Sequence, residues 1–218
     1  MTLPEQVAEE APRGYADEGA AHSCAHSYLL PALDRLLREA AGGLPVKRVF
    51  DLGCGNGSVG AHLSQQGWDV VGVDPSEEGI AQAKRTYPAL NLSLSNAFDD
   101  LATVYGRFPI VYSLEVVEHV FYPRKYAATL FSLLEPGGMA IVSTPYHSYF
   151  KNLVLALTGK MDQHFTALWD YGHIKFWSIA TLSLLLRDAG FTEIGSLRVG
   201  RFPALAKSMI LTARKPGA

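Results

Sequence analysis

Three glycines at alternate positions, Gly53, Gly55 and Gly57, constrain this chain more than any other feature of its sequence. They follow the apolar run 46–51 (VKRVFD), which is typical of a buried strand, and they precede a helical pattern over 58–66. Glycine allows positive φ and lets a backbone approach a ligand closely. A bend of this kind between strand and helix lies at the carboxyl edge of an α/β sheet, where such sheets bind ligands. The loop therefore predicts a nucleotide-type site.

Beyond the loop, apolar runs and helical patterns alternate, which indicates a mainly parallel sheet. The pattern predicts strands at 69–74, 91–95, 108–113 and 139–144, and helices at 76–87, 126–134 and 179–189. Two final β patterns, 191–199 and 207–214, must pair as an antiparallel hairpin, because the link between them is too short for a parallel crossover. We therefore predict a single α/β domain over 1–218, with no internal boundary.

Two segments lie outside this alternation. Residues 1–43 contain a helical pattern from about Tyr15 to Ala41, and we expect them to form a cap segment. Residues 145–177 form an insertion that is rich in aromatic side chains. We expect this insertion to form a helical, aromatic lid over the carboxyl edge of the sheet.

The composition narrows the class of partner. Charged residues make up 18% of the chain and the net charge is −2, so no basic field exists to hold a nucleic-acid backbone. The two cysteines, Cys24 and Cys54, give no disulfide framework and suit a reducing cytoplasm. No apolar stretch approaches the roughly 20 residues of a membrane-spanning helix. These features predict a cytoplasmic protein that acts on small molecules; they leave its oligomeric state open.

The details of the loop indicate which nucleotide it would bind. A dinucleotide loop reads G-x-G-x-x-G, whereas here the third glycine comes one residue early, at Gly57. Asp51 directly precedes the loop, and its carboxylate would repel a pyrophosphate but attract an ammonium group. Asp74 ends the next strand, where a carboxylate can accept hydrogen bonds from ribose hydroxyls. A nicotinamide-dependent dehydrogenase therefore remains only as an alternative.

The run Asp-Leu-Gly-Cys-Gly-Asn-Gly (51–57) resembles motif I of the class I S-adenosylmethionine-dependent methyltransferases. The similarity extends from about Val46 to Lys215. Within that superfamily, the segments Leu-Glu-Val-Val-Glu-His (114–119) and His-x-x-Phe-Trp-Ser (173–178) resemble the ubiquinone-biosynthesis O-methyltransferase branch. The resemblance implies a Rossmann-like, seven-stranded, mostly parallel sheet with an antiparallel last strand and helices on both faces. It also implies S-adenosylmethionine as the cofactor.

The same resemblance implies roles at matching positions of this chain. Asp51 would order the ammonium group, and Asp74 would bind the ribose. The remaining cofactor contacts implied are Gly53, Cys54 and Gly55 at the methionine portion, Pro75, Ser76, Asn96 and Ala97 at the adenine, and Leu114 and Glu115 at the methionine end. Many relatives carry Asp where this chain has Asn96.

His119 is the candidate catalytic residue. It follows the fourth strand, near the expected methyl group, and an imidazole can remove a proton from a hydroxyl near neutral pH. The alternative is a histidine that bonds locally and does no chemistry. Glu115, Glu118 and His119 have i, i+3, i+4 spacing, so on a helix they would share a face and could hold a divalent cation. We prefer the interpretation without a metal, in which the carboxylates serve the cofactor or a helix terminus.

The predicted lid supplies the candidate substrate residues, Tyr146, Trp169 and His173. Its aromatic side chains suit an apolar or aromatic molecule, although they also suit simple packing of the insertion onto the domain. Weak association with a membrane surface is a further possibility.

The sequence thus predicts a methyltransferase that acts on a small molecule, most simply at a hydroxyl oxygen of an aromatic or lipophilic acceptor. N- or C-methylation and a non-catalytic cofactor-binding domain remain alternatives. The acceptor itself is not specified by these motifs.

Overall fold

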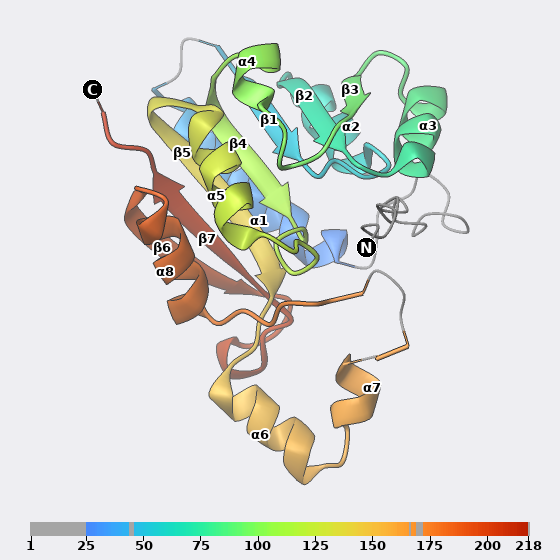
Figure 1. Cartoon of the computed structure of the whole chain (residues 1–218), viewed down its shortest axis with the longest axis vertical. Helices are drawn as coiled ribbons and strands as arrows, with labels where there is room; N and C mark the ends of the chain where they lie inside the picture. Colours follow the sequence, from blue (N-terminus) through green and yellow to red (C-terminus); the bar gives the residue numbers. More distant parts are fainter. Residues whose placement is uncertain (1–24, 44–45, 166, 169–171, 218) are drawn as a thin grey trace, which may run out of the picture.

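A computed structural model describes residues 25–43, 46–165, 167–168 and 172–217. Its central feature is one seven-stranded sheet in the order β3-β2-β1-β4-β5-β7-β6 (Figure 1). The first five strands are parallel to one another, and β7 runs antiparallel between β5 and β6. The strands are β1 (Arg48–Leu52), β2 (Asp69–Asp74), β3 (Asn91–Leu94), β4 (Phe108–Leu114), β5 (Leu134–Pro145), β6 (Thr192–Val199) and β7 (Ser208–Arg214). The predicted fold class and the antiparallel hairpin are confirmed.

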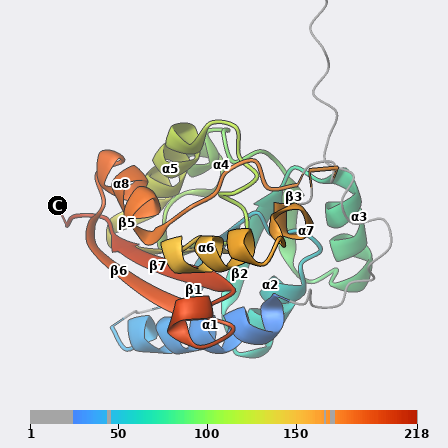
Figure 2. The same ribbon diagram turned by 90° about the horizontal axis from the view of Figure 1, so that it is seen from below.

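Helices cover both faces of this sheet (Figure 2). They are α1 (His26–Ala41), α2 (Ser58–Gln65), α3 (Glu77–Thr86), α4 (Leu101–Tyr105), α5 (Pro123–Ser132), α6 (Tyr149–Leu157), α7 (Met161–Phe165) and α8 (Ile179–Asp188), with a 3-10 turn η1 (Pro203–Leu205). One face packs against α1 and α2, and the other against α4, α5 and α8. Alternate residues of each strand serve the two faces: Val49 faces α1, whereas Phe50 packs on the opposite side.

Local chemistry explains most of the element boundaries. Helix α5 begins at Pro123, three residues before the predicted start, because a proline suits the first helical position. Helix α8 begins with a capping box between Ser178 and Thr181. Strand β5 begins at Leu134, five residues earlier than predicted, because Leu134 already pairs with Phe108. The glycine pair at 137–138 therefore lies within the strand instead of ahead of it.

Helix α4 has no counterpart among the predicted helices, whereas α6 and α7 agree with the expected helical character of the insertion 145–177. The last two lie in the aromatic insertion, beyond the carboxyl ends of β4 and β5 (Figure 1). Helix α6 buries none of its residues. The part of the predicted N-terminal helix before residue 25 lies outside the described residues. Among the described residues, none of the helices is long and apolar enough to cross a membrane.

Candidate functional site

The glycine loop follows β1 at the carboxyl edge of the sheet, as the sequence predicts. Gly53 and Gly57 have φ of 94° and 77°, which side chains rarely adopt. A Cβ added at Gly53 would collide with Cγ2 of Val116, and one at Gly57 would lie 2.7 Å from Cδ1 of Leu92. Glycine is therefore needed at both positions for conformation and for close packing.

The loop's N–H groups already have partners inside the protein. Gly53 and Cys54 donate to the Val73 carbonyl, at 2.8 and 3.0 Å, and Gly55 donates to Oδ2 of Asp74 at 2.8 Å. Ser58, at the start of α2, donates to the side chain of Asn56 at 3.2 Å. These four donors are therefore used by β2 and by the loop itself. The bend offers close approach and its carbonyl oxygens instead.

Asp51 lies beneath this loop and is only 2% exposed. The hydroxyl of Tyr112, on β4, donates to its Oδ2 at 2.8 Å. Burial raises the pKa of Asp51 to about 7, although the Tyr112 bond opposes the shift and the nearby Asp74 adds to it. A cation placed beside Asp51 would offset this desolvation, so the site favours an ammonium group.

Asp74 ends β2 and connects the loop to the next helix. Its Oδ1 accepts from the N–H of Ser76 at 2.9 Å, and its Oδ2 accepts from Gly55. Ser76 in turn caps α3 by accepting from the N–H of Gly79 at 3.0 Å. Burial raises the pKa of Asp74, while the two backbone donors lower it. Each carboxylate oxygen still has a second lone pair, so the residue can accept from ribose hydroxyls.

Asn96 and Ala97 lie in the turn after β3, beside Asp74. The N–H of Ser95 donates to the Asp74 carbonyl at 3.2 Å, which brings the turn to the same edge. Asn96 donates its N–H to Asp99 at 2.7 Å and accepts from the N–H of Phe98 at 3.1 Å. The Asn96 side chain thus shapes the turn, and Asp99 supplies the carboxylate next to it.

Glu115 directly follows Leu114, the last residue of β4, and has a positive φ of 54°. Its two oxygens accept from the hydroxyls of Ser143 at 2.8 Å and Ser208 at 3.2 Å, so it is tied to β5 and β7. Burial raises its pKa to about 7, and the two serine bonds oppose that shift. The strained backbone is the kind that collects at functional sites.

Glu115, Glu118 and His119 do not share a helical face, so the prediction that they could form one triad is wrong. Residues 115–119 form a turn, and Glu115 bonds away from the other two. The structure places His173 beside Glu118 and His119 instead. Both histidine Nε2 atoms lie 4.0 Å from Oε1 of Glu118, and one ligand atom from each residue lies within 4.8 Å of the others.

This cluster, Glu118–His119–His173, has the properties of a cation site. Glu118 is 1% exposed, and within the described chain neither of its oxygens has a hydrogen-bond partner. Burial and the neighbouring Glu115 raise its pKa well above the usual range. Burial also lowers the pKa of His173 to about 4, so its ring is neutral, as a metal ligand must be. Nδ1 of His119 lies 3.2 Å from the Gly172 carbonyl, which orients the ring.

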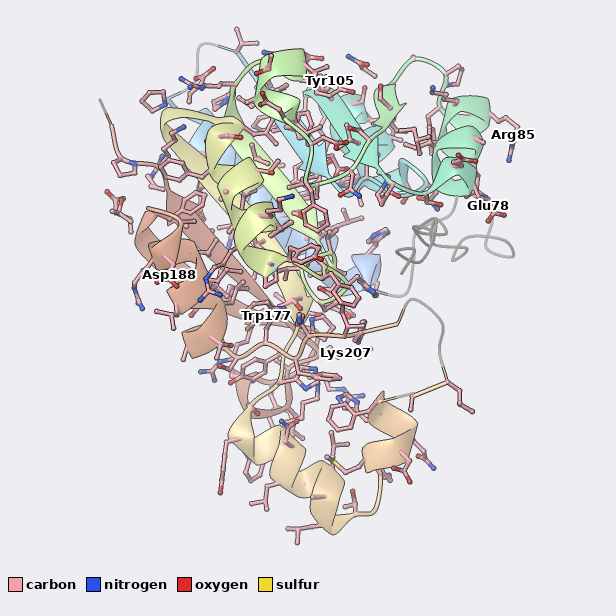
Figure 3. The ribbon with its side chains drawn as sticks, viewed as in Figure 1. Glu78, Arg85, Tyr105, Trp177, Asp188 and Lys207 are labelled. Atoms are coloured by element: carbon pink, nitrogen blue, oxygen red, sulfur yellow. The ribbon has the colours of Figure 1, made fainter. Side chains whose placement is uncertain are left out.

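The end of the insertion holds this cluster together. No motif or spacing in the sequence indicates this contact between the insertion and the turn after β4. Ile174 and Lys175 both donate their N–H to the Glu118 carbonyl at 3.0 Å. Nε1 of the buried Trp177 donates to the Val117 carbonyl at 3.1 Å. Residues 172–177, which we name the return segment, thus run along the turn after β4. Figure 3 shows Trp177 and Lys207 where the main body meets the insertion.

The other predicted substrate residues are placed only in part. Tyr146 is 8% exposed, and its N–H donates to the Lys207 carbonyl at 2.9 Å. It joins β5 to the insertion rather than pointing from a separate lid. Trp169 lies outside the described residues.

Comparison with known proteins agrees with this geometry. A family model described as "Methyltransferase domain" matches residues 24–194. The chain belongs to this methyltransferase family. A ubiquinone biosynthesis O-methyltransferase of Psychrobacter arcticus is 32% identical over 165 residues, covering 72% of this chain and 63% of that protein. The corresponding protein of Cereibacter sphaeroides is 33% identical over 163 residues, covering 72% and 66%. This methyltransferase chain therefore spans less than two thirds of the length of these relatives.

Solved structures place the methyltransferase in the same fold. A SAM-dependent methyltransferase from Archaeoglobus fulgidus has a TM-score of 0.65 at 18% identity and covers 86% of this chain and 93% of its own. Magnesium protoporphyrin IX methyltransferase from Synechocystis, with bound SAH, has a TM-score of 0.59 at 25% identity and covers 85% and 82%. The first is described as SAM-dependent and the second holds SAH, the demethylated form of that cofactor.

Proposed function

We propose that this domain transfers a methyl group from S-adenosylmethionine to a hydroxyl oxygen of a small aromatic or lipophilic acceptor. The observation that carries the proposal is the pair of buried carboxylates, Asp51 and Asp74, on either side of the glycine loop. Asp51 would offset the ammonium charge of the cofactor, and Asp74 would accept from its ribose hydroxyls. Asn96 and Ala97, in the turn beside Asp74, would border the adenine. The bound cofactor supplies an activated methyl group, so the protein contributes mainly position and proton removal.

His119 is the proposed base. The Gly172 carbonyl can only accept, so Nδ1 of His119 carries the proton in that contact, and the lone pair of the neutral ring lies on Nε2. With the cofactor bound, its methyl group would pass to the acceptor oxygen, and S-adenosylhomocysteine would be the second product. The hydroxyl proton goes to Nε2. Such a base contributes about 10²–10⁴-fold in rate.

The cluster Glu118–His119–His173 favours a second candidate for the same reaction. A divalent cation held by the Glu118 carboxylate and the two Nε2 atoms would lower the pKa of a bound hydroxyl. A buried carboxylate whose oxygens lack partners in the described chain fits a cation better than it fits packing alone. If this candidate is correct, chelation abolishes activity and added magnesium or zinc restores it. Activity that survives exhaustive chelation leaves His119 as the base.

The proposal also covers the role of the insertion, the cellular location and the class of partner. Residues 145–177 would cover the acceptor, with Tyr146 and His173 beside it, and 1–43 would form the cap segment. The exposed apolar side chains of α6, among them Tyr149 and Leu157, would suit a lipophilic acceptor or weak contact with a lipid surface. The buried free thiol of Cys54 and the net charge of −2 support a cytoplasmic location and a small-molecule partner instead of nucleic acid.

The decisive experiment is a coupled assay for S-adenosylhomocysteine across catechols, quinol precursors, amines and carboxylic acids. Turnover confined to hydroxyl compounds supports O-methylation, whereas turnover of amines alone would move the proposal to N-methylation. His119→Ala should lower kcat by about 10²–10⁴-fold with unchanged calorimetric affinity for S-adenosylhomocysteine. His62→Ala, on α2, is the matched control and should retain activity. Binding without turnover of any compound would favour a non-catalytic domain, and NAD binding in its place would favour a dehydrogenase.

A further inference from the structure

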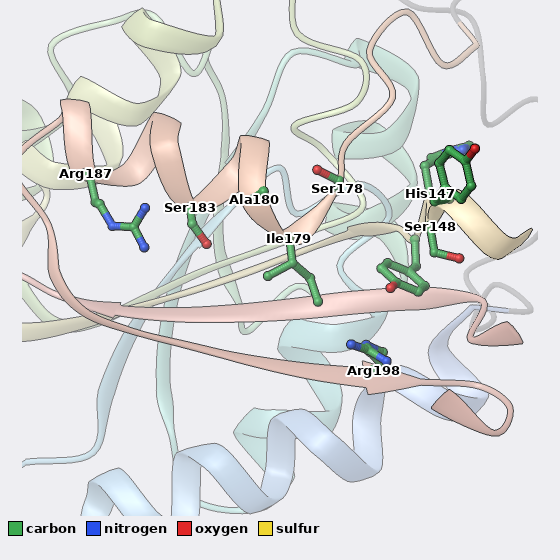
Figure 4. Close-up of a pocket in the computed structure, with 10 residues that line it drawn as sticks. His147, Ser148, Ser178, Ile179, Ala180, Ser183, Arg187 and Arg198 are labelled. Atoms are coloured by element: carbon green, nitrogen blue, oxygen red, sulfur yellow. The ribbon is translucent and has the colours of Figure 1, made fainter. Parts of the chain in front are cut away.

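A cavity of about 530 Å³ lies next to the proposed acceptor site and has a different chemical character. It is bounded by one face of α8 along its whole length, the end of β6 and the residues that lead into α6 (Figure 4). Arg198, near the end of β6, pairs with Met209 of β7, and Pro145, the last residue of β5, pairs with the adjacent Ser208. Arg198 and Pro145 therefore lie at the same edge of the sheet. The cavity therefore opens at the functional edge.

Two arginines dominate the lining. Ile179, Ser183 and Arg187 are spaced four residues apart, so they share one face of α8, and Arg198 lines the cavity from β6. Figure 4 shows Arg198 below Ile179 and Arg187 toward the other end of the helix. No carboxylate lines the cavity. Within the described part of the chain, neither Arg187 nor Arg198 makes an ion pair, although four other arginines do so. Two guanidinium groups thus face one cavity without a counter-charge.

The rest of the lining limits the kind of ligand. Ile179, Ala180 and the Tyr146 ring supply apolar surface, and the Arg198 guanidinium lies 5.3 Å from the centre of that ring. The hydroxyls of Ser178 and Ser183 add polar groups. Guanidinium groups recognise carboxylates and phosphates through paired hydrogen bonds. The lining suits an anionic group that is attached to an apolar or aromatic body.

His147 connects this cavity to the proposed reaction site. It lines the cavity, and its ring centre lies 5.4 Å from that of His164 and 5.1 Å from that of Phe176 in the return segment. His173, in the same segment, interacts electrostatically with His147 and lies 5.0 Å, ring to ring, from His119. The return segment therefore contacts the proposed base through His173 and the cavity residue His147 through Phe176.

We propose that this cavity binds the anionic part of the methyl acceptor, a phosphate or a carboxylate. Arg187 and Arg198 hold the anionic oxygens, while the methylated hydroxyl lies at His119. That the bound molecule is the methyl acceptor rests on the proposed function, whereas anion binding by the two arginines does not. The acceptor class is thereby narrowed to hydroxyl compounds that carry a negatively charged substituent.

Calorimetry with phenyl phosphate, benzoate and phenol tests the anion site directly. Wild-type protein should bind at least one of the two anions saturably and should not bind phenol. Arg187→Gln and Arg198→Gln should each weaken that binding about tenfold or more. Arg85→Gln removes an exposed arginine from α3, on a distant part of the molecule (Figure 3), and should not change it. The anion with the higher affinity, phenyl phosphate or benzoate, shows whether the site prefers a phosphate or a carboxylate.

Two results would overturn the proposal: no saturable binding of either anion to wild-type protein, or equal binding by wild type and both variants. The affinity for S-adenosylhomocysteine, measured on the same samples, should be unchanged in all variants. If wild-type protein does not bind S-adenosylhomocysteine, that result counts against the proposed function and not against the anion site. With acceptors that turn over, the two variants should raise KM for anionic compounds and leave kcat nearly constant. A preferred acceptor without any anionic group would also contradict the proposal.

Discussion

At the scale of single residues, the site contains buried carboxyl groups whose ionised form is unfavourable in the protein without ligand. Asp51 has one neutral donor, Tyr112, for a fully buried carboxyl group. Asp74 has two backbone donors and Glu115 has two serine hydroxyls, yet burial still raises the pKa of each. Groups whose ionised form is this costly are typical of ligand sites, because a bound cation or hydroxyl compensates them.

Asp51 should make the protein without ligand less stable as the pH rises. Its pKa is 3.8 for a free side chain and about 7 when folded, so the folded state binds more protons between these values. The free energy of unfolding should therefore fall from about pH 4 to about pH 7 and remain lower above it. Asp51→Asn should remove this contribution, at most about 4 kcal/mol, which urea titrations at several pH values would measure.

The neighbours of Asp51 define the control for that prediction. Asp74, Cys54 and Tyr112 are its titratable neighbours, and all three remain in the variant. Glu78→Gln, an exposed carboxyl in α3, should leave the wild-type pH dependence in place. A pH profile of Asp51→Asn identical to that of wild type would show that Asp51 ionises normally. The same variant should bind S-adenosylhomocysteine at least tenfold more weakly.

At the scale of elements, the return segment positions the cluster Glu118–His119–His173. Its contacts with the turn after β4 are backbone bonds to the Glu118 carbonyl and the Trp177 bond to Val117. These bonds join positions that are about sixty residues apart in the sequence. The turn and the segment therefore behave as one unit only when the fold is complete.

Trp177→Phe should loosen this unit without unfolding the domain. The substitution removes one buried hydrogen bond, which is worth about 1 kcal/mol, and keeps an aromatic ring in the core. Hydrogen exchange at the amides of Ile174 and Lys175 should become faster, while amides of β1 stay protected. Trp68→Phe, a buried tryptophan on the α1 side of the sheet, is the control. Equal exchange at 174–175 in wild type and Trp177→Phe would disprove the positioning role.

At the scale of the whole molecule, the sheet separates two tasks. The strands β1, β2 and β3 present most of the proposed cofactor residues, and Leu114 and Glu115 follow from the end of β4. The cluster, Tyr146 and the arginine cavity lie along β4, β5, β6 and β7. The glycine loop and the turn after β4 meet where Gly53 packs on Val116. A methyl donor on one side and an acceptor on the other would then meet at that junction.

Cofactor binding should therefore stabilise the whole domain. S-adenosylhomocysteine at a hundred times its Kd should add about 2.7 kcal/mol to the free energy of unfolding, which raises Tm by several degrees in thermal scans. Asp51→Asn, which should bind at least tenfold more weakly, should show at most about half of this increase at the same concentration, whereas His119→Ala should match wild type. An increase of Tm in Asp51→Asn equal to that of wild type would remove Asp51 from the cofactor site.

The sequence determined the parts of this protein that depend on local spacing. The run 46–57 fixes a strand, a tight bend and a helix start, and the short link 200–206 allows only a hairpin. Asp51 and Asp74 reach the same edge because each lies at the carboxyl end of a parallel strand. The order of apolar runs was therefore enough to predict the strands of the sheet, whereas the roles of the proposed cofactor residues came from the resemblance of the loop to motif I.

Only the tertiary structure decided which distant segments meet. It engaged the loop's N–H groups with Val73 and Asp74, replaced Glu115 by His173 beside His119, and brought Arg187 and Arg198 to the lining of one cavity. None of these pairings follows from periodicity, because each joins residues whose separation along the chain says nothing about distance in space. Packing of the whole domain selects them, since buried polar groups must find partners wherever the fold brings them.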